Sequence, residues 1–114
     1  MAECIFCDIV AGNIPSEKVY EDDEVLAFND IHAQAPTHVL VIPKKHIASA
    51  RELGEKDAAL LGKIFAAINR IAQEKGLMEK GFRIVNNCGK DGGQTVHHIH
   101  FHLLGGRHLT WPPG

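Results

Sequence analysis

Hydrophobic and polar residues follow two different periods along this chain. Between Glu55 and Lys75, apolar residues recur at steps of three and four, which predicts one amphipathic helix that ends before Gly76. The segment from Ala2 to Val10 is expected to form two short helical turns before glycine and proline interrupt it. Alternating or β-branched apolar runs predict strands over residues 19–20, 24–30, 38–43, 82–87 and 97–104.

These elements predict the fold class. Strands joined by short turns, with a single long helix among them, favour an antiparallel sheet that has the helix on one face, an α+β fold. No internal repeat, low-complexity tract or linker separates the elements. We therefore expect one domain spanning residues 1–114.

Composition narrows the kinds of partner. The formal net charge is -2, with 23% charged residues, so the chain lacks the positive charge typical of proteins that bind polymeric nucleic acid or anionic membranes. A small anion needs only a few local donors and stays a plausible ligand.

The ends of the chain and its cysteines bear on location. A signal peptide needs a basic start followed by a continuous apolar stretch, and Glu3 and Asp8 interrupt any such stretch here. No apolar run in the sequence reaches membrane-spanning length. Cys4, Cys7 and Cys88 form an odd set with no disulfide framework. We expect a cytoplasmic protein with reduced thiols or metal-bound cysteines.

Candidate chemistry gathers in the last predicted strand, in a chain with eight histidines. Because side chains alternate across a strand, His98, His100 and His102 should share one face, and the apolar residues between them should face the core. A neutral imidazole near its ordinary pKa of about 6.5 can act as a nucleophile toward phosphorus. Two other interpretations stay open: a polar strand face, and a catalytic zinc held by these histidines.

A glycine-rich loop runs into this strand from Gly89 to Thr95. Glycines allow backbone N–H groups to approach an anion, and Thr95 adds a hydroxyl group. The loop therefore favours phosphorus chemistry over the zinc interpretation, although such a loop is more often a simple turn.

The string from His98 to Leu104 resembles the histidine triad signature, in which histidines alternate with hydrophobic residues. The likeness covers essentially the whole chain and is closest to the nucleotide-binding branch of purine nucleoside phosphoramidases. It extends to residues 21–23, 26–30, 35–38, 41–46, 91–94, 105–107 and the Trp-Pro-Pro-Gly end at 111–114.

This resemblance implies a fold and an activity. The fold would be a five-stranded antiparallel sheet with one long and one short N-terminal helix, which dimerises into a ten-stranded sheet. The activity would be hydrolysis of purine nucleoside 5′-phosphoramidates, adenylyl-lysine and aminoacyl-adenylates to the nucleoside monophosphate, without a catalytic cofactor.

The resemblance also implies roles for individual residues. The nucleophile would be His100, with His102 acting on the leaving group and phosphate charge, and His98 and His38 supporting orientation. Thr95 stands where the family usually has serine. The expected nucleotide contacts are Asp30 and Ile31 with the ribose, Phe6 and Phe28 (with Ile5 and Ile9) around the base, and Asn87, Gly93 and Gln94 at the phosphate.

The Cys4-x-x-Cys7 pair marks a second expected site. Many bacterial members of the family bind a structural zinc through such a pair and two histidines, and the matching residues here would be His46 and His98. Two thiolates and two imidazoles suit a closed tetrahedral zinc site. The alternative is a pair of unligated thiols on a short helix.

The sequence is compatible with three functions. The first is a phosphoramidase with a covalent nucleotidyl-His100 intermediate, the second is a zinc-dependent hydrolase, and the third is a non-enzymatic nucleotide-binding or scaffold protein. The expected partners are a purine nucleotide conjugate and a second copy of the chain.

Overall fold

The computed structural model describes residues 3–114, which contain one five-stranded antiparallel sheet with the strand order β1-β2-β3-β5-β4. The strands are β1 (Lys18–Glu21), β2 (Val25–Asn29), β3 (Thr37–Pro43), β4 (Phe82–Val85) and β5 (Phe101–Gly105). The helices are α1 (Ile5–Val10) and α2 (Ala58–Glu74), with short 3-10 turns η1 (Ala50–Glu52) and η2 (Glu55–Asp57) before α2. The α+β prediction is confirmed; Ala2, in the predicted N-terminal segment, lies outside the described residues.

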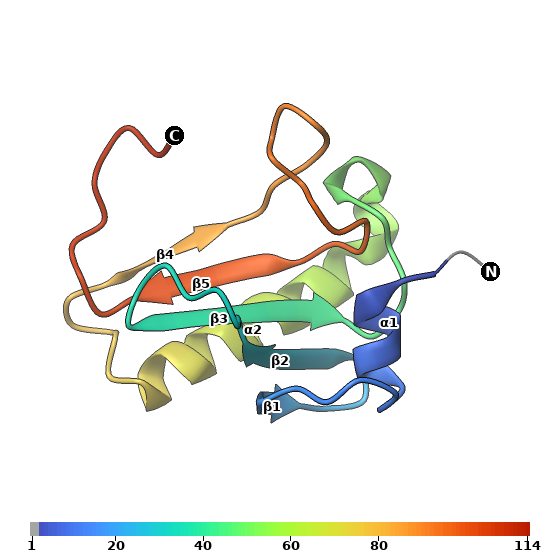
Figure 1. Ribbon diagram of the computed structural model, residues 1–114, viewed down its shortest axis with the longest axis horizontal. Coiled ribbons are helices and arrows are strands. Elements are labelled where there is room, and N and C mark those ends of the chain that lie inside the picture. Colours follow the sequence, from blue (N-terminus) through green and yellow to red (C-terminus); the bar gives the residue numbers. More distant parts are fainter. Residues whose placement is uncertain (1–2) are drawn as a thin grey trace.

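The long helix α2 covers one face of the sheet (Figure 1). Its apolar stripe of Ile64, Ile68 and Ile71 is buried against sheet residues such as Val39 and Leu103. The helix ends as the sequence predicts, and Gly76 follows it with a φ of 72° that suits glycine. Within residues 3–114, none of the helices is long and apolar enough to cross a membrane.

The short helix α1 lies on the opposite face of the sheet. Phe6 and Ile9 from this helix pack against β2 and β3 residues Leu26, Phe28 and Leu40, which forms a second and smaller apolar cluster. Because α1 has only six residues, it covers just one part of that face. The uncovered part beside it becomes the site described below.

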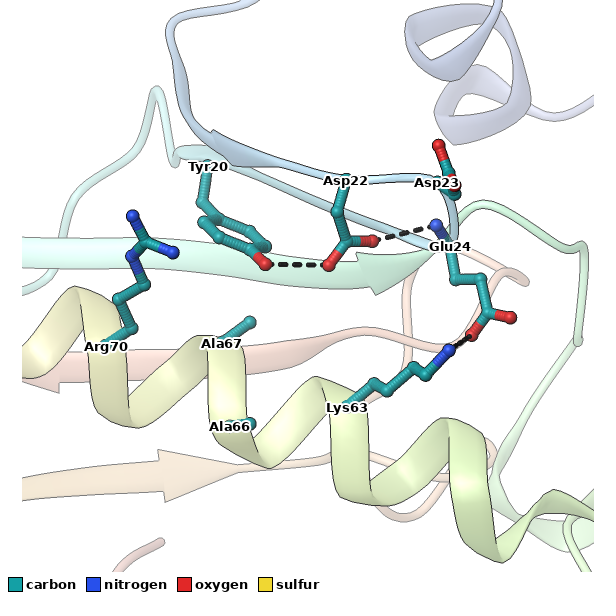
Figure 2. Close-up of a pocket in the computed structure, with 8 residues that line it drawn as sticks. All are labelled: Tyr20, Asp22, Asp23, Glu24, Lys63, Ala66, Ala67 and Arg70. Carbon is teal, nitrogen blue, oxygen red and sulfur yellow. Dashed lines mark hydrogen bonds and ion pairs between the residues drawn. The ribbon is translucent and has the colours of Figure 1, made fainter.

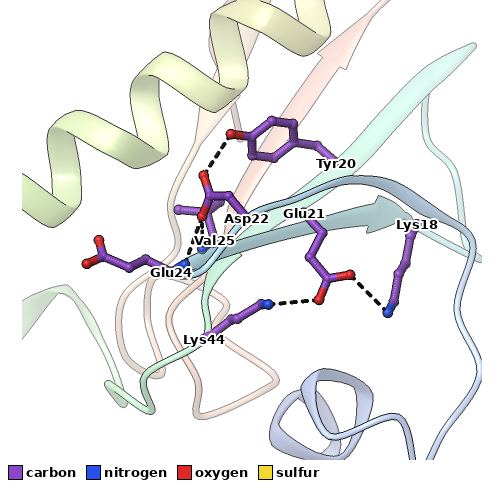
Figure 3. A network of polar contacts seen from close by, with 7 residues as sticks. All are labelled: Lys18, Tyr20, Glu21, Asp22, Glu24, Val25 and Lys44. Atoms are coloured by element: carbon purple, nitrogen blue, oxygen red, sulfur yellow. Dashed lines mark hydrogen bonds and ion pairs between the residues drawn. The ribbon is translucent and has the colours of Figure 1, made fainter.

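The β1–β2 turn is closed by the acidic residues that the sequence places there (Figure 3). Asp22 Oδ1 accepts hydrogen bonds from the backbone N–H groups of Glu24 and Val25, both at 2.8 Å. The Tyr20 hydroxyl donates to the other oxygen of Asp22 at 2.7 Å and lowers the pKa of that carboxyl group. The predicted hairpin with a charged turn is therefore confirmed.

The predicted strand at residues 97–104 is wrong at its start, because β5 begins only at Phe101. The ladder with β3 stops after the Val41–Phe101 pair, since Pro43 has no N–H group and its carbonyl accepts a hydrogen bond from His98 Nε2 at 2.8 Å. The N–H group of Ile99 instead donates to Ile47 O at 2.6 Å.

The predicted alternation of faces nevertheless continues through this irregular segment. Ile99 and Phe101 belong to the α2-side core. The Phe6 ring, on the other face, contacts both His98 and His100, with centroid distances of 5.9 and 5.2 Å. The histidines thus face α1 although two of them precede the strand.

Candidate active site

A cavity of about 710 Å³ opens on the α1 side of the sheet, a size typical of small-molecule sites. Its wall comes from α1, β2, β3, the β2–β3 loop and the segment that leads into β5. Its largest side chains are apolar, and its polar groups include two histidines from the triad string. Its lining includes Ile5, Phe6, Ile9, Phe28, Asp30, Ile31, Gln34, His38, Thr95, His100 and His102.

His100 lines this cavity with one ring nitrogen already engaged. Its Nδ1 lies 2.8 Å from the carbonyl oxygen of His98, and because a carbonyl can only accept, Nδ1 carries the proton. In the neutral ring, Nε2 is then the nitrogen with a free lone pair. The side chain is 5% exposed, so burial and the carbonyl hold this tautomer in place.

A hydrogen-bond relay fixes the orientation of His102. The backbone N–H of Gln34 donates to His38 Nδ1 at 3.0 Å, so the proton of a neutral His38 is on Nε2. His38 Nε2 lies 2.9 Å from His102 Nδ1 and donates to it, which leaves the proton of His102 on Nε2. Asp30 Oδ2, 3.4 Å from His38 Nε2, adds a negative charge beside the relay.

Electrostatics keep both rings of the relay neutral. Burial, followed by the neighbouring His100 and His38, lowers the pKa of His102 to about 4. Burial also lowers the pKa of His38, although Asp30 opposes this shift. Near neutral pH the pair therefore presents a neutral N–H donor from His102.

A second cluster lies behind the cavity wall, where Cys4, Cys7, His46 and His98 bring their ligand atoms within 4.8 Å of one another. His98 Nε2 donates to Pro43 O, which leaves its Nδ1 as a lone-pair donor toward the cluster. Burial and then Cys4 raise the pKa of the Cys7 thiol to about 11. Binding a cation here would therefore release protons.

The distances in this cluster fit a tetrahedral zinc ion. Ordinary zinc bond lengths put two nitrogen ligands about 3.3 Å apart and a sulfur and a nitrogen about 3.6 Å apart. The two Nδ1 atoms of His46 and His98 are 3.2 Å apart. The sulfur-to-nitrogen distances are 3.4 Å for Cys4–His98, 3.4 Å for Cys7–His46 and 3.6 Å for Cys7–His98. The donor set therefore suits zinc in both chemistry and spacing.

Asp30, His38 and His102 also bring possible ligand atoms together, but they do not fit a metal. A metal bound to His38 Nε2 would push the proton of that ring onto Nδ1, where the N–H of Gln34 already points. Two donors would then face each other. These three residues act instead as a hydrogen-bonded relay.

Several predicted site residues line the cavity. His100, His102, His38 and Thr95 do so. His98 lies instead in the cluster that it forms with Cys4, Cys7 and His46, called the zinc-type cluster below. The predicted nucleotide-contact residues on the cavity wall are Phe6, Phe28, Asp30 and Ile31, with Ile5 and Ile9 beside them.

Three predicted phosphate contacts are not brought to this wall. Asn87 lines a separate depression near the C-terminal segment. The backbone N–H groups of Gly93 and Gln94 donate to Lys90 O and Gly89 O within their own loop, both at 3.0 Å. The Gln94 side chain bonds Gly89, Ala48 and Val96, so it holds the loop together.

Sequence reasoning missed the part of Gln34. Its contribution is a backbone N–H group, which every residue except proline has, so no sequence pattern could have identified it. The missed lining residues Ile14 and Pro15 lie in the break after α1, where only the folded chain shows that they turn toward the cavity.

Another depression, of about 360 Å³, lies between the β1–β2 turn and α2 (Figure 2). Several of its polar groups already have partners: Lys63 binds Glu24 at 3.0 Å, the Tyr20 hydroxyl donates to Asp22, and Arg70 lies over the Tyr20 ring. It contains no histidine or cysteine. The α1-side cavity is therefore the better candidate for chemistry.

Sequence comparisons agree with this geometry. The HIT domain family model matches residues 11–109. An uncharacterized HIT-like protein of Synechococcus elongatus is 52% identical over 112 residues, covering 98% of this chain and 97% of that protein. A 14 kDa zinc-binding protein of Zea mays is 47% identical over 112 residues, covering 96% of this chain and 87% of that protein.

A solved structure is similar over nearly the whole chain. The crystal structure of a HIT family hydrolase from Legionella pneumophila matches with a TM-score of 0.97 and 53% sequence identity. The match covers 98% of this chain and 100% of the other.

Proposed function

Since this chain belongs to the HIT domain family, we propose that it hydrolyses the P–N bond of purine nucleoside 5′-phosphoramidates and related nucleotidyl conjugates. From a phosphoramidate the products are the nucleoside monophosphate and the free amine. Adenylyl-lysine also has a P–N bond. An aminoacyl-adenylate is a related conjugate in which a P–O bond breaks and a carboxylate leaves.

One observation carries this proposal: the His98 carbonyl, 2.8 Å from His100 Nδ1, leaves the lone pair on Nε2 of a ring that lines the cavity. A nucleophile needs that lone pair, and a binding protein has no need to fix it. The orientation of the two other histidines disfavours the zinc-dependent hydrolase. His98 directs its Nδ1 atom to His46, and His102 directs its Nδ1 atom to His38, so neither shares a metal with His100 through that atom.

In the first proposed step, His100 Nε2 forms a bond to phosphorus as the bond from phosphorus to the leaving nitrogen breaks. The Nε2–H of His102 donates to the phosphoryl oxygens and stabilises their charge. The leaving nitrogen takes up one proton, and the exposed hydroxyl of Thr95 on the cavity wall relays it from solvent.

In the second step, water attacks phosphorus and the bond to His100 Nε2 breaks. The water oxygen stays on phosphorus, and its surplus proton balances the one that the amine took up. The Phe6 and Phe28 rings hold the base, and the Asp30 carboxylate accepts hydrogen bonds from the ribose hydroxyls.

We further propose that Cys4, Cys7, His46 and His98 hold a structural zinc ion. Such an ion supplies folding free energy and no step of the reaction. The convergence of four ligand atoms on one point supports this assignment. The zinc-binding relative from Zea mays carries the property in its name.

The proposed assembly is a homodimer. Strand β4 stands at the end of the strand order, so within the described residues one of its edges pairs with no strand. Its pairing with β4 of a second copy would give the ten-stranded sheet and cover this edge.

Adenosine 5′-phosphoramidate is the substrate that tests this function. We expect the wild-type protein to release AMP, and His100→Ala to lose at least about a thousandfold in kcat. His97→Ala, a change in the exposed neighbouring histidine, is the matched control and should keep its activity. AMP binding without turnover by the wild type would favour the scaffold function instead.

A further inference from the structure

We propose that Arg107 is a positioning residue for the His38–His102 pair, acting through Gln34 in the β2–β3 loop. This inference rests on the proposed phosphoramidase function, because the pair matters to a reaction only if the cavity carries one out. Arg107 does not line the cavity, and it therefore acts at a distance.

The guanidinium group of Arg107 holds residue 34 by its carbonyl oxygen. Nη2 donates to Gln34 O at 2.8 Å, and Nε donates to the same oxygen at 3.2 Å. Nη1 donates to His108 O at 3.0 Å, which ties the group to its own segment. The N–H group of the same Gln34 donates to His38 Nδ1. One residue thus connects the arginine to the relay.

Hydrogen bonds hold this exposed loop. Two are internal, from His32 N–H to Asp30 Oδ1 and from Gln34 Nε2 to His32 O, and two come from Arg107. Residues 31–34 are all exposed, and burial therefore holds little of this segment. A second contact acts at the same place: Gly106, with a φ of 93°, packs so closely that an added Cβ would lie 2.8 Å from Pro36 Cβ. The chain after β5 therefore meets this loop at both Gly106 and Arg107.

Loss of the Arg107 hydrogen bonds would change the tautomers of both histidines. Without a donor fixed at Nδ1, only Asp30, 3.4 Å from Nε2, still favours the proton on Nε2, and His38 can carry its proton on either nitrogen. In the alternative state its Nε2 has a lone pair, and His102 must then place its own proton on Nδ1. His102 would present a lone pair instead of an N–H to the phosphoryl oxygens, and catalysis in that state would fail.

Lysine cannot replace this arginine. Its single ammonium nitrogen lacks the planar fork that reaches one carbonyl with two N–H groups and a second carbonyl with a third. Arg107→Lys therefore keeps the charge and removes the geometry. Arg70→Lys is the matched control, since Arg70 lies over the Tyr20 ring, at the α2-side depression.

The test begins with a measurement that does not depend on activity. Long-range ¹H–¹⁵N correlation spectra show which ring nitrogen carries the proton. In the wild type and in Arg70→Lys we expect His38 and His102 to be protonated on Nε2. In Arg107→Lys we expect a mixture of tautomers for both rings.

Kinetics with adenosine 5′-phosphoramidate supply the second measurement. We expect Arg107→Lys to lower kcat between about ten- and a hundredfold with KM unchanged, because it misplaces a group needed in the transition state. In Arg107→Ala, added ethylguanidinium should restore part of kcat, and added ethylammonium should not.

The outcomes separate this inference from the function that it assumes. Unchanged tautomers, or a kcat within twofold of the wild type in Arg107→Lys, overturn the positioning role. Mixed tautomers in a protein whose wild type turns over no phosphoramidate support the effect of Arg107 on the pair and reject the proposed function.

Discussion

The Phe6 ring stands edge-on to the imidazole of His100, with the centroids 5.2 Å apart and the planes at 88°. Phe6 belongs to α1, whose N-cap is Cys4 and whose first turn contains Cys7. The helix that carries both cysteines of the zinc-type cluster therefore also packs against the proposed nucleophile. We expect substitutions in the cluster to affect His100, and substitutions around His100 to affect the cluster.

Phe6→Leu tests the apolar wall of the cavity. Leucine nearly conserves volume, so the free energy of unfolding should fall by only about 1 kcal/mol. It removes the aromatic face that a nucleobase would stack on, so the Kd for AMP should rise about tenfold. Calorimetric titration with AMP measures this, and an unchanged Kd would remove Phe6 from the base site.

The proposed zinc site predicts one zinc ion per chain in the purified protein. Cys4→Ser and Cys7→Ser should lose the metal and lower Tm, because a structural zinc ion contributes folding free energy. Elemental analysis and thermal unfolding of each variant measure the two effects.

Cys88→Ser is the matched control for that experiment. Cys88 is a partly buried free thiol that lies outside the cluster. This variant should keep both the zinc ion and the Tm. Full zinc content in Cys4→Ser would contradict the site.

Stability should fall on acidification because of His102. The folded protein lowers the pKa of this ring from 6.5 to about 4, so the unfolded chain binds a proton first as the pH decreases. The contribution of His102 to the free energy of unfolding is constant above about pH 6.5 and decreases as the pH falls from there toward 4. Urea unfolding at pH 7 and pH 5 measures the difference.

His102→Gln is the control for this titration. It removes the ionising group and keeps polar character, so its loss of stability between pH 7 and pH 5 should be smaller than in the wild type. Acid release of a metal would affect both proteins alike. An equal loss in the two proteins, or a His102 NMR titration near pH 6.5, would contradict the shift.

The edge of β4 predicts the assembly state. A homodimer joined at this edge would have a mass in solution of about 25 kDa, twice the 12.5 kDa of one chain. Light scattering measures that mass. Hydrogen exchange at Phe82–Val85 should slow as protein concentration rises, and a concentration-independent rate would place the interface elsewhere.

The sequence predicted the fold class because its periodic patterns are strong. The helix from Glu55 to Lys75 needed only a regular apolar stripe, and the structure departs from it by turning Glu55–Asp57 into a 3-10 turn. The strand through His98 was placed too early, because the alternation of side chains continues where the backbone pairing stops. The pairing ends because of Pro43, which lies in β3, and the local pattern around His98 contains no information about that strand.

The candidate site was predictable in its side chains and not in its backbone groups. His100 and His102 stand out in the sequence through their spacing. The tautomers that give these rings their roles depend on the backbone carbonyl of His98 and the backbone N–H of Gln34. Nearly every residue has the same two backbone groups, so the sequence does not single these out. Gln94, predicted to contact phosphate, has its amide committed to three loop contacts that only the folded chain brings together.

Three polar atoms of His98 serve three separate partners: Nδ1 faces the cysteines, Nε2 binds Pro43, and the carbonyl holds His100. Descendants of this chain that lost both thiols would still benefit from an imidazole at position 98, because its bond to Pro43 fixes the carbonyl beside it. Histidine should therefore outlast the cysteines during divergence. A residue proposed here as a metal ligand would then persist as a scaffold residue.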